Sequence, residues 1–365
     1  MKSLTLLLPL AIAAALSGAC GSSGGGGGPC TPGAAGVDTS GNFPSSLAAY
    51  CMVSIQNAAV TPGAGVTPYD LNTPLFSDYA VKYRTVWMPP GATAPYQATD
   101  TFDLPAGTVL TKSFGFPADL RVAGAPVKWV ETRVYVNTTK GWKGTSYTWD
   151  DAQQSATISP GGEILDLSFI DSTGKTQSPH YLIPSQAECP KCHANEGTAT
   201  PLGPRADQIN RTFTYSTGAE NELAHWASIG LLSGAPAPSK APVLPVWNDP
   251  STGTVAARAR AYLQANCSYC HDGDGEARTT GLVLTDTESN QMAWGVCKPP
   301  IAAGKAAIGE KYDIVPGHPE QSILIYRATS TLPSIAMPEI GRSLEHVEGV
   351  ALLSEWVSGL TGTCP

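Results

Sequence analysis

Alternating apolar and polar positions dominate the first half of the chain. Short runs rich in Val, Thr and aromatic residues have the period of two that is typical of strands, and Pro and Gly separate them. These runs lie at 81–87, 107–114 and 129–136, near Tyr147 and Ile158, and at 163–170. Strands of this length at this spacing predict a β-sandwich-like domain over residues 45–180.

The run at 129–136 also predicts which residues share a face of the sheet. Successive side chains of a strand point to opposite faces. We therefore expect Val130, Val134 and Val136 on one face, and Trp129 and Tyr135 on the other.

The apolar period changes to that of helices in the second half of the chain. A helix is expected at 220–232, within a segment, 181–242, that is otherwise rich in loops. Two more helices are expected at 252–265 and 344–360. They predict an all-α unit over residues 243–365, so the chain as a whole is expected to be of mixed, α+β class.

The N-terminus has the pattern of an export signal. Lys2 precedes an apolar stretch at 4–16 that is too short to be a stable membrane anchor, and small residues lead up to Cys20. We expect residues 1–20 to be a lipoprotein signal that ends in lipidation of Cys20, with an ordinary cleaved signal peptide as the alternative. The Gly-rich residues 21–44 are then a flexible tether. This predicts a periplasmic protein or one anchored to the outer membrane.

Charge excludes one class of partner. The net charge is −8, from 22 Lys and Arg against 30 Asp and Glu, and the basic residues do not cluster. Nucleic-acid binding needs clustered cations, so we expect no nucleic-acid partner. Outside the N-terminal signal, no segment is long and apolar enough to cross a bilayer, so membrane contact is expected only through the lipid anchor.

The chain has nine cysteines, which fall into three groups. Four lie in two Cys-x-x-Cys-His motifs, at 189–193 and 267–271, and Cys20 is the expected lipid site. An even remainder in an exported protein suggests disulfides. Proximity in sequence favours Cys30–Cys51, which leaves Cys297–Cys364; the other pairings and free thiols remain open.

The Cys-x-x-Cys-His motif is typical of covalent haem attachment. Its two thiols can each add to one vinyl group of haem, and the histidine that follows binds the iron. Two such motifs predict two covalently bound haem c groups. The expected thioether residues are Cys189, Cys192, Cys267 and Cys270, and the expected axial histidines are His193 and His271. Three alternatives compete: one four-cysteine zinc site, two thioredoxin-like redox motifs, or two plain disulfides.

Each haem needs a further axial ligand. For the second haem we expect Met337, which Pro338 follows just before the last predicted helix, in preference to Met292. Methionine ligation raises the reduction potential. The first haem has no methionine between the two motifs. His180 and His225 are the main candidates for it, and Met52, Met88 and His346 are the remaining ones.

The C-terminal order of helix, Cys-x-x-Cys-His, loop, Met-Pro and helix resembles a small class I cytochrome c domain. This resemblance implies a C-terminal all-α cytochrome c-like domain at 243–365 that holds the second haem. With the N-terminal β-sandwich-like domain at 45–180 and a first haem-binding segment of loops and helix at 181–242, three parts are expected.

Longer stretches of the chain resemble a family of dihaem c-type cytochromes exported by Gram-negative bacteria. The similar stretches are 71–79, 105–110, 181–185, 260–267, 315–317, 337–342 and 348–353. The resemblance covers the chain from about residue 45 to its end, and it implies two haems and an N-terminal β region.

Three functions are compatible with these features. The first is an electron carrier, not an enzyme, that passes single electrons between redox proteins of the cell envelope; its acidic character favours basic partners. The second is a haem enzyme whose first haem has an open coordination position and acts on peroxide or another small molecule. The third is a binding module, in which the β-rich domain holds a ligand or a partner cytochrome.

Overall fold

The computed structural model describes residue 32 and residues 41–195, 198–301 and 303–365. The predicted signal at 1–20, including Cys20, lies outside the described residues, as do Cys30 and most of the predicted tether. Among the residues that are described, no helix is long and apolar enough to cross a membrane.

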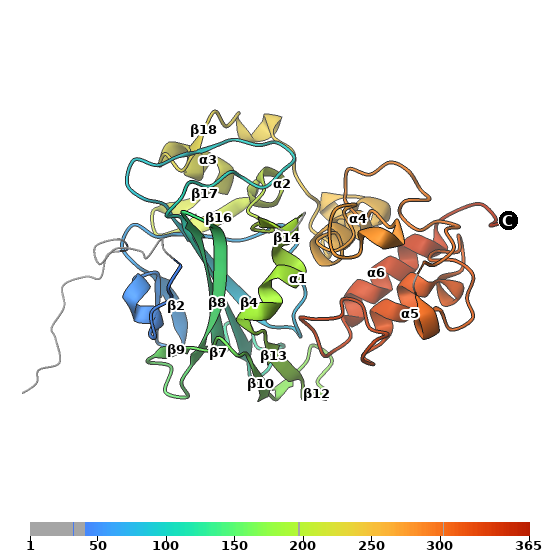
Figure 1. Cartoon of the computed structure of the whole chain (residues 1–365), viewed down its shortest axis with the longest axis horizontal. Helices are drawn as coiled ribbons and strands as arrows, with labels where there is room; N and C mark the ends of the chain where they lie inside the picture. The colour runs from blue at the N-terminus through green and yellow to red at the C-terminus, as the bar shows by residue number, and fades with distance from the viewer. Residues whose placement is uncertain (1–31, 33–40, 196–197, 302) are drawn as a thin grey trace, which may run out of the picture.

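A six-stranded antiparallel sheet forms the centre of the N-terminal part (Figure 1). Its strands are β3 (Thr67–Tyr69), β4 (Val81–Trp87), β6 (Val109–Pro117), β7 (Val127–Thr138), β8 (Gly141–Trp149) and β9 (Ala156–Ile158), hydrogen-bonded in that order. β4, β6, β7, β8 and β9 lie where the alternating runs predict them, because β-branched and aromatic residues pack well on a pleated surface. The short strand β3 was not predicted.

The predicted faces of β7 were wrong at one point. The register between β6 and β7 shifts at Phe114 and Gly115, and Val130 is left without a partner on β6. One extra residue in a strand reverses the alternation of faces beyond it. Trp129 therefore packs in the same core as Val134, and Val130 packs in a different one.

One face of the sheet packs against the N-terminal segment. That segment forms η1 (Leu47–Tyr50), β1 (Val53–Gln56) and β2 (Ala59–Pro62). Tyr50 meets the fully buried Tyr147 edge to face, with ring centroids 6.1 Å apart. In the described part of the chain the covering layer is this small hairpin and turn, so the prediction of a second large sheet, as in a sandwich, was wrong.

Small sheets and short helices surround the opposite face. The paired strands are β5 (Ala94–Pro95) with β18 (Leu232–Ser233), β10 (Glu163–Asp166) with β13 (His180–Ile183), β11 (Phe169–Ile170) with β12 (Thr176–Gln177), β14 (Ala194–Asn195) with β15 (Thr198–Ala199), and β16 (Thr212–Tyr215) with β17 (Gly218–Asn221). The helices of this region are η2 (Gln186–Glu188), α1 (Cys189–His193), α2 (Ala206–Ile209), α3 (Glu222–Ser228) and η3 (Pro238–Lys240).

The C-terminal part contains three α-helices and four short 3₁₀ turns among the described residues. They are η4 (Pro250–Thr252), α4 (Val255–Asn266), η5 (Arg278–Thr280), η6 (Gly304–Ala307), η7 (Pro319–Gln321), α5 (Ile323–Thr329) and α6 (Val347–Ser358). α4 and α6 pack together through a core that includes Leu263, Leu353 and Trp356.

The predicted all-α cytochrome c-like domain at 243–365 was wrong. The described chain is mainly β-rich, and its helices are short: even α4 and α6 have only 12 residues each. Between α4 and α5 the chain runs through loops and 3₁₀ turns, because Gly and Pro recur there and both favour turns over helix.

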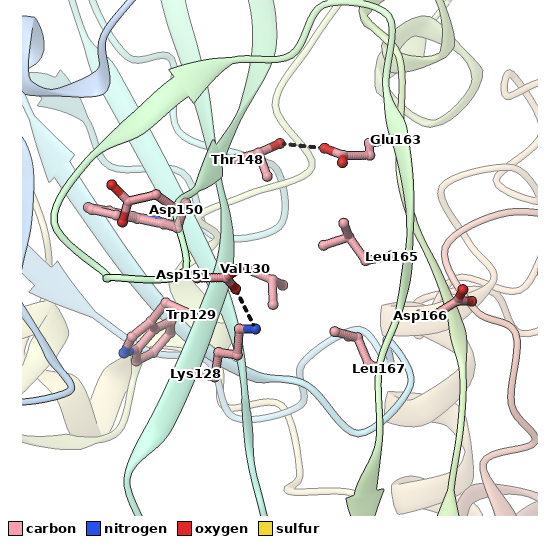
Figure 2. A pocket seen from close by; sticks show the side chains of 11 residues that line it. Lys128, Trp129, Val130, Thr148, Asp150, Asp151, Glu163, Leu165, Asp166 and Leu167 are labelled. Carbon is pink, nitrogen blue, oxygen red and sulfur yellow. Dashed lines mark hydrogen bonds and ion pairs between the residues drawn. The ribbon is translucent and has the colours of Figure 1, made fainter.

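A pocket of about 300 Å³ lies between the central sheet and β10 (Figure 2). Thr148 donates a hydrogen bond to Glu163 at 3.3 Å at one side of it, and Lys128 pairs with Asp151 at 2.9 Å. None of its lining residues belongs to either Cys-x-x-Cys-His motif.

Candidate functional site

The two Cys-x-x-Cys-His motifs lie side by side, although they are far apart in the sequence. The first motif is α1, on the side of the sheet that faces the C-terminal part, and the second follows directly after α4 (Figure 1). The Cys270 thiol points to the carbonyl oxygen of Lys191, with Sγ and oxygen 3.8 Å apart. Burial, with a smaller effect of Cys192, raises the pKa of Cys270 to about 12.

The central sheet holds the first motif in place. The Cys189 thiol lies 3.9 Å from the carbonyl oxygen of Gly144 on β8. A Cβ at Gly144 would come within 2.7 Å of the Tyr135 ring, so glycine there allows Tyr135 to pack closely. Just before α1, Glu188 accepts hydrogen bonds from the backbone and the hydroxyl of Ser185, both at 3.0 Å, which stabilises the start of the turn.

His193 has one ring nitrogen engaged and the other free for a metal. Its Nδ1 lies 3.3 Å from the carbonyl oxygen of Thr200, and its ring lies 5.0 Å from the Tyr135 ring. A carbonyl only accepts, so Nδ1 carries the proton and Nε2 keeps its lone pair. Burial, together with the charges of Arg133 and Lys112, lowers the pKa of His193 to about 4, so the ring is neutral near pH 7.

His271 reaches the same state through a threonine. Its Nδ1 lies 3.2 Å from the Thr280 hydroxyl, which donates its own proton to the Ala277 carbonyl at 2.7 Å. The hydroxyl has one proton, so His271 is the donor in their shared bond, and Nε2 is again free. Burial, with a contribution from Arg327, lowers the pKa of His271 to about 4.

The motif cysteines are free thiols. The described residues contain no disulfide within either motif, and burial raises the pKa of Cys267 to about 12 and that of Cys192 to about 11. No group of three or more His, Cys, Asp or Glu side chains in the described part of the chain is arranged to hold a metal ion. The four-cysteine zinc alternative needs such a group of thiolates. Each motif offers two thiols and one neutral imidazole, the donor groups that covalent haem attachment uses.

The segment around Met337 is hydrogen-bonded to Arg327 and Arg342. The Met337 amide donates to the Arg327 carbonyl at 2.9 Å, and Arg342 donates to the Met337 carbonyl at 2.7 Å. The charge of Arg327 is the second-largest cause, behind burial, of the lowered pKa of His271. Met337 is half-buried, whereas Met292 is 57% exposed.

His180 and His225, the main candidates for the further ligand of the first haem, both pair with other residues. His180 is exposed on β13 and pairs with Asp166 at 2.7 Å. His225 on α3 pairs with Glu220 at 2.7 Å and stacks on Tyr215 with ring centroids 3.7 Å apart. No hydrogen bond or ring contact joins either histidine to the described part of the first motif.

The remaining candidates are buried in cores. Met52 is fully buried in the core beneath η1, and Met88 is buried beside α2 and α3. His346 stacks on Phe76 with centroids 4.1 Å apart and shares a 2.9 Å hydrogen bond with Tyr262.

Residues 70–79 form a strap between the two parts of the chain. That this strap positions the second motif was not predicted from the sequence. The Phe76 amide donates to the side chain of Asn266, the residue before Cys267, at 2.8 Å. Asp78 accepts hydrogen bonds from the amides of Ser343 and Leu344, both at 2.7 Å. The strap therefore fixes the second motif relative to the sheet. Apart from the stretch 71–79 that carries the family resemblance, the sequence has no signal for this role.

A group of cations beside the first motif was also not predicted from the sequence. Lys82, Lys112 and Arg133 come from neighbouring strands of the sheet and surround the Phe114 ring. A charged position on each of three strands was the available signal, but the pairing of those strands could not be known.

Disulfides account for three cysteines outside the motifs. Cys297 and Cys364, the pair predicted from the sequence, are joined by a disulfide. Cys51 is also disulfide-bonded, and its predicted partner Cys30 lies outside the described residues.

No family model, curated protein or solved structure matches this chain.

Proposed function

We propose that the chain is an exported dihaem c-type cytochrome that transfers electrons between redox partners in the cell envelope. The observation that carries this proposal is the contact between the two motifs, in which the Cys270 thiol lies 3.8 Å from the Lys191 carbonyl oxygen. When bound, the two haems supply reversible one-electron chemistry at iron.

The chain's own residues have distinct tasks in this proposal. The paired cysteines of each motif would attach a haem, and the neutral imidazoles of His193 and His271 would bind its iron through Nε2. Thr200 and Thr280 orient the two rings through Nδ1, at 3.3 Å and 3.2 Å. Met337 would supply a thioether to the second iron, and such a ligand would raise the reduction potential.

The adjacency of the motifs supports transfer within one chain. The strap at 70–79 and the contact between Cys270 and Lys191 hold the two attachment points together. Haems bound at the two motifs would then lie in one chain, with no second protein needed between them.

The surface charge supports a choice of partner. With a net charge of −8, the chain attracts basic redox proteins, and salt screens this attraction. The rate of reduction by a basic partner should fall as ionic strength rises; a rate independent of salt would remove the steering argument.

A haem enzyme with an open first haem is the second candidate. It is favoured by the pairing of His180 with Asp166 and of His225 with Glu220. These pairings leave the first site without either histidine as a further ligand. In that case, the first site would bind peroxide or another small molecule and the second would relay electrons to it.

A haem count with optical and EPR spectra tests the proposal. The wild-type protein, exported by a host that attaches haem, should carry two haems per chain. Cys189→Ala with Cys192→Ala should carry one, and so should Cys267→Ala with Cys270→Ala. The control, Cys297→Ser with Cys364→Ser, should keep two, because its thiols lie outside the motifs.

The spectra distinguish the two candidates. Two low-spin haems support the electron carrier. One high-spin haem that binds cyanide or carbon monoxide, and that is lost with Cys189 and Cys192, favours the enzyme. A chain without covalent haem would overturn both.

A further inference from the structure

Three cationic side chains gather on one face of the central sheet. Lys82, Lys112 and Arg133 surround the Phe114 ring, with their charged groups 5.9, 4.8 and 4.4 Å from its centroid. The strand register places Lys112 opposite Arg84 on one side and opposite Arg133 on the other. Like charges in such positions repel, so the arrangement costs stability unless an anion compensates it.

The described protein does not supply enough anions for this group. Glu131 pairs with Arg133 at 2.6 Å, and Asp70 pairs with Arg84 at 2.6 Å. Among the described residues, Lys82 donates only to the Ala80 carbonyl, at 3.0 Å.

Lys112 contacts the Phe114 ring, but its ammonium group forms neither a hydrogen bond nor an ion pair with the described residues. The Nη2 group of Arg84, next to Lys112 in register, is buried without a hydrogen-bond partner. The Arg84 Nη2 group is held away from water without a partner, which is costly, and the Lys112 ammonium beside it has no compensating anion; both points indicate a ligand that carries negative charge.

The titration of both lysines agrees with a surplus of positive charge. Burial, with the added repulsion of Arg84 and Arg133, lowers the pKa of Lys82 to about 7. Burial and the same neighbours, together with Lys82, lower the pKa of Lys112 well below its ordinary value. An anion held between the two ammonium groups would restore both charges.

The cations lie beside the first motif. Burial is the largest influence on the pKa of Cys192 and of His193. The positive charges of Arg133 and Lys112 lower both pKa values. Arg133 and Tyr135, whose ring contacts His193, are two residues apart on β7 and so point to the same face of the sheet.

We propose that Lys82, Lys112 and Arg133 form an anion site for a carboxylate or a small inorganic oxyanion beside the first motif. The negatively charged group has two sources: a propionate of the haem attached at that motif, or a free oxyanion from solution. Only the propionate source rests on the proposed function, because the free-oxyanion source needs no haem.

Binding of inorganic phosphate, measured by calorimetry on the full-length chain, tests the site and distinguishes its sources. Two forms are compared, the wild type and a first-haem-free variant that combines Cys189→Ala, Cys192→Ala and His193→Ala. If phosphate binds only to the variant, a propionate occupies the site in the wild type. If it binds to both, the site takes a free oxyanion. If it binds to neither, the proposal is overturned.

Substitutions show whether the binding belongs to these residues. Lys112→Gln should weaken phosphate binding by about tenfold or more, since charge-assisted hydrogen bonds are the strong ones. Lys128→Gln is the matched control, because Lys128 lies on the same sheet with its side chain 58% exposed and should not affect binding. Equal affinities in Lys112→Gln and the wild type would also overturn the proposal.

Two further measurements keep the result interpretable. The haem count of the wild type tests the proposed function independently, and a wild type without haem can still bind phosphate at this site. If the first-haem-free variant does not fold, acylation of Lys112 is followed by mass spectrometry in the wild type instead. Protection of Lys112 that depends on phosphate identifies a free oxyanion, and protection that is lost when the chain is produced without haem identifies a propionate. Full acylation under both conditions contradicts the site.

Discussion

The Sγ atom of Cys270 lies 3.8 Å from the carbonyl oxygen of Lys191, so each Cys-x-x-Cys-His motif contacts the other. This contact joins the β-rich part of the chain to the helical C-terminal part. The strap at 70–79 supports the same junction through Phe76, Asp78 and Tyr79, which bond to Asn266, Ser343 and Glu348. The candidate redox centre is thus built at the junction of two parts, and neither part contains all of it.

Met337→Ala should remove the thioether ligand of the second haem. The expected results are loss of the methionine-type absorption band and a lower reduction potential for one haem, with the haem count unchanged. Optical spectra and a potentiometric titration measure both effects. Met292→Ala is the control, since Met292 is 57% exposed. An unchanged spectrum in Met337→Ala would assign the ligand to another residue.

Gly144→Ala should loosen the attachment of the first motif. The new Cβ would meet the Tyr135 ring at 2.7 Å, and overpacking of this kind costs about 1–3 kcal/mol. We expect a lower midpoint in chemical denaturation and incomplete loading of one haem. Gly161→Ala, where a Cβ meets nothing within 4 Å, should leave both unchanged. Equal stability of the two variants would contradict the packing assigned to Tyr135.

Loss of the Cys297–Cys364 disulfide should destabilise the C-terminal part. The bridge spans 67 residues, and cross-links of this kind contribute about 2–4 kcal/mol. Cys297→Ser with Cys364→Ser is therefore expected to unfold at lower denaturant concentration while it keeps both haems. A variant as stable as the wild type would mean that the loop is ordered without its bridge.

His346 should make the junction sensitive to acid. Burial is the main cause that lowers its pKa from 6.5 to about 4; Lys82 and Arg342 act in the same direction and Glu348 opposes them. The folded state therefore holds the neutral ring and binds fewer protons than the unfolded chain. Stability is lost as pH falls from 6.5, and the loss is complete near pH 4, at an upper bound of about 3 kcal/mol.

Denaturation at several pH values measures this effect. His346→Gln should show a smaller loss of stability between pH 6.5 and 4 than the wild type. His318→Gln, at a histidine whose side chain is 55% exposed, should follow the wild-type curve. Parallel curves for the wild type and His346→Gln would mean that His346 does not titrate in the folded protein.

The sequence by itself determined the local chemistry. Thiols two residues apart followed by histidine define an attachment motif wherever they lie, because the groups are neighbours in the chain. The strands β4 and β7 and the helices α4 and α6 also follow from local periodicity. The pairing of Cys297 with Cys364 was predicted because few cysteines remained outside the motifs and the expected lipid site.

Only the tertiary structure decided what lies next to what. The bulge at Val130, the strap at 70–79 and the contact between Cys270 and Lys191 all depend on residues far apart in the sequence. The predicted all-α C-terminal domain was wrong for a related reason: motif order does not determine how much of the intervening chain becomes helix. The cations at Lys112 and Arg133 became a candidate site once β6 and β7 paired, because charge acts through space and not along the chain.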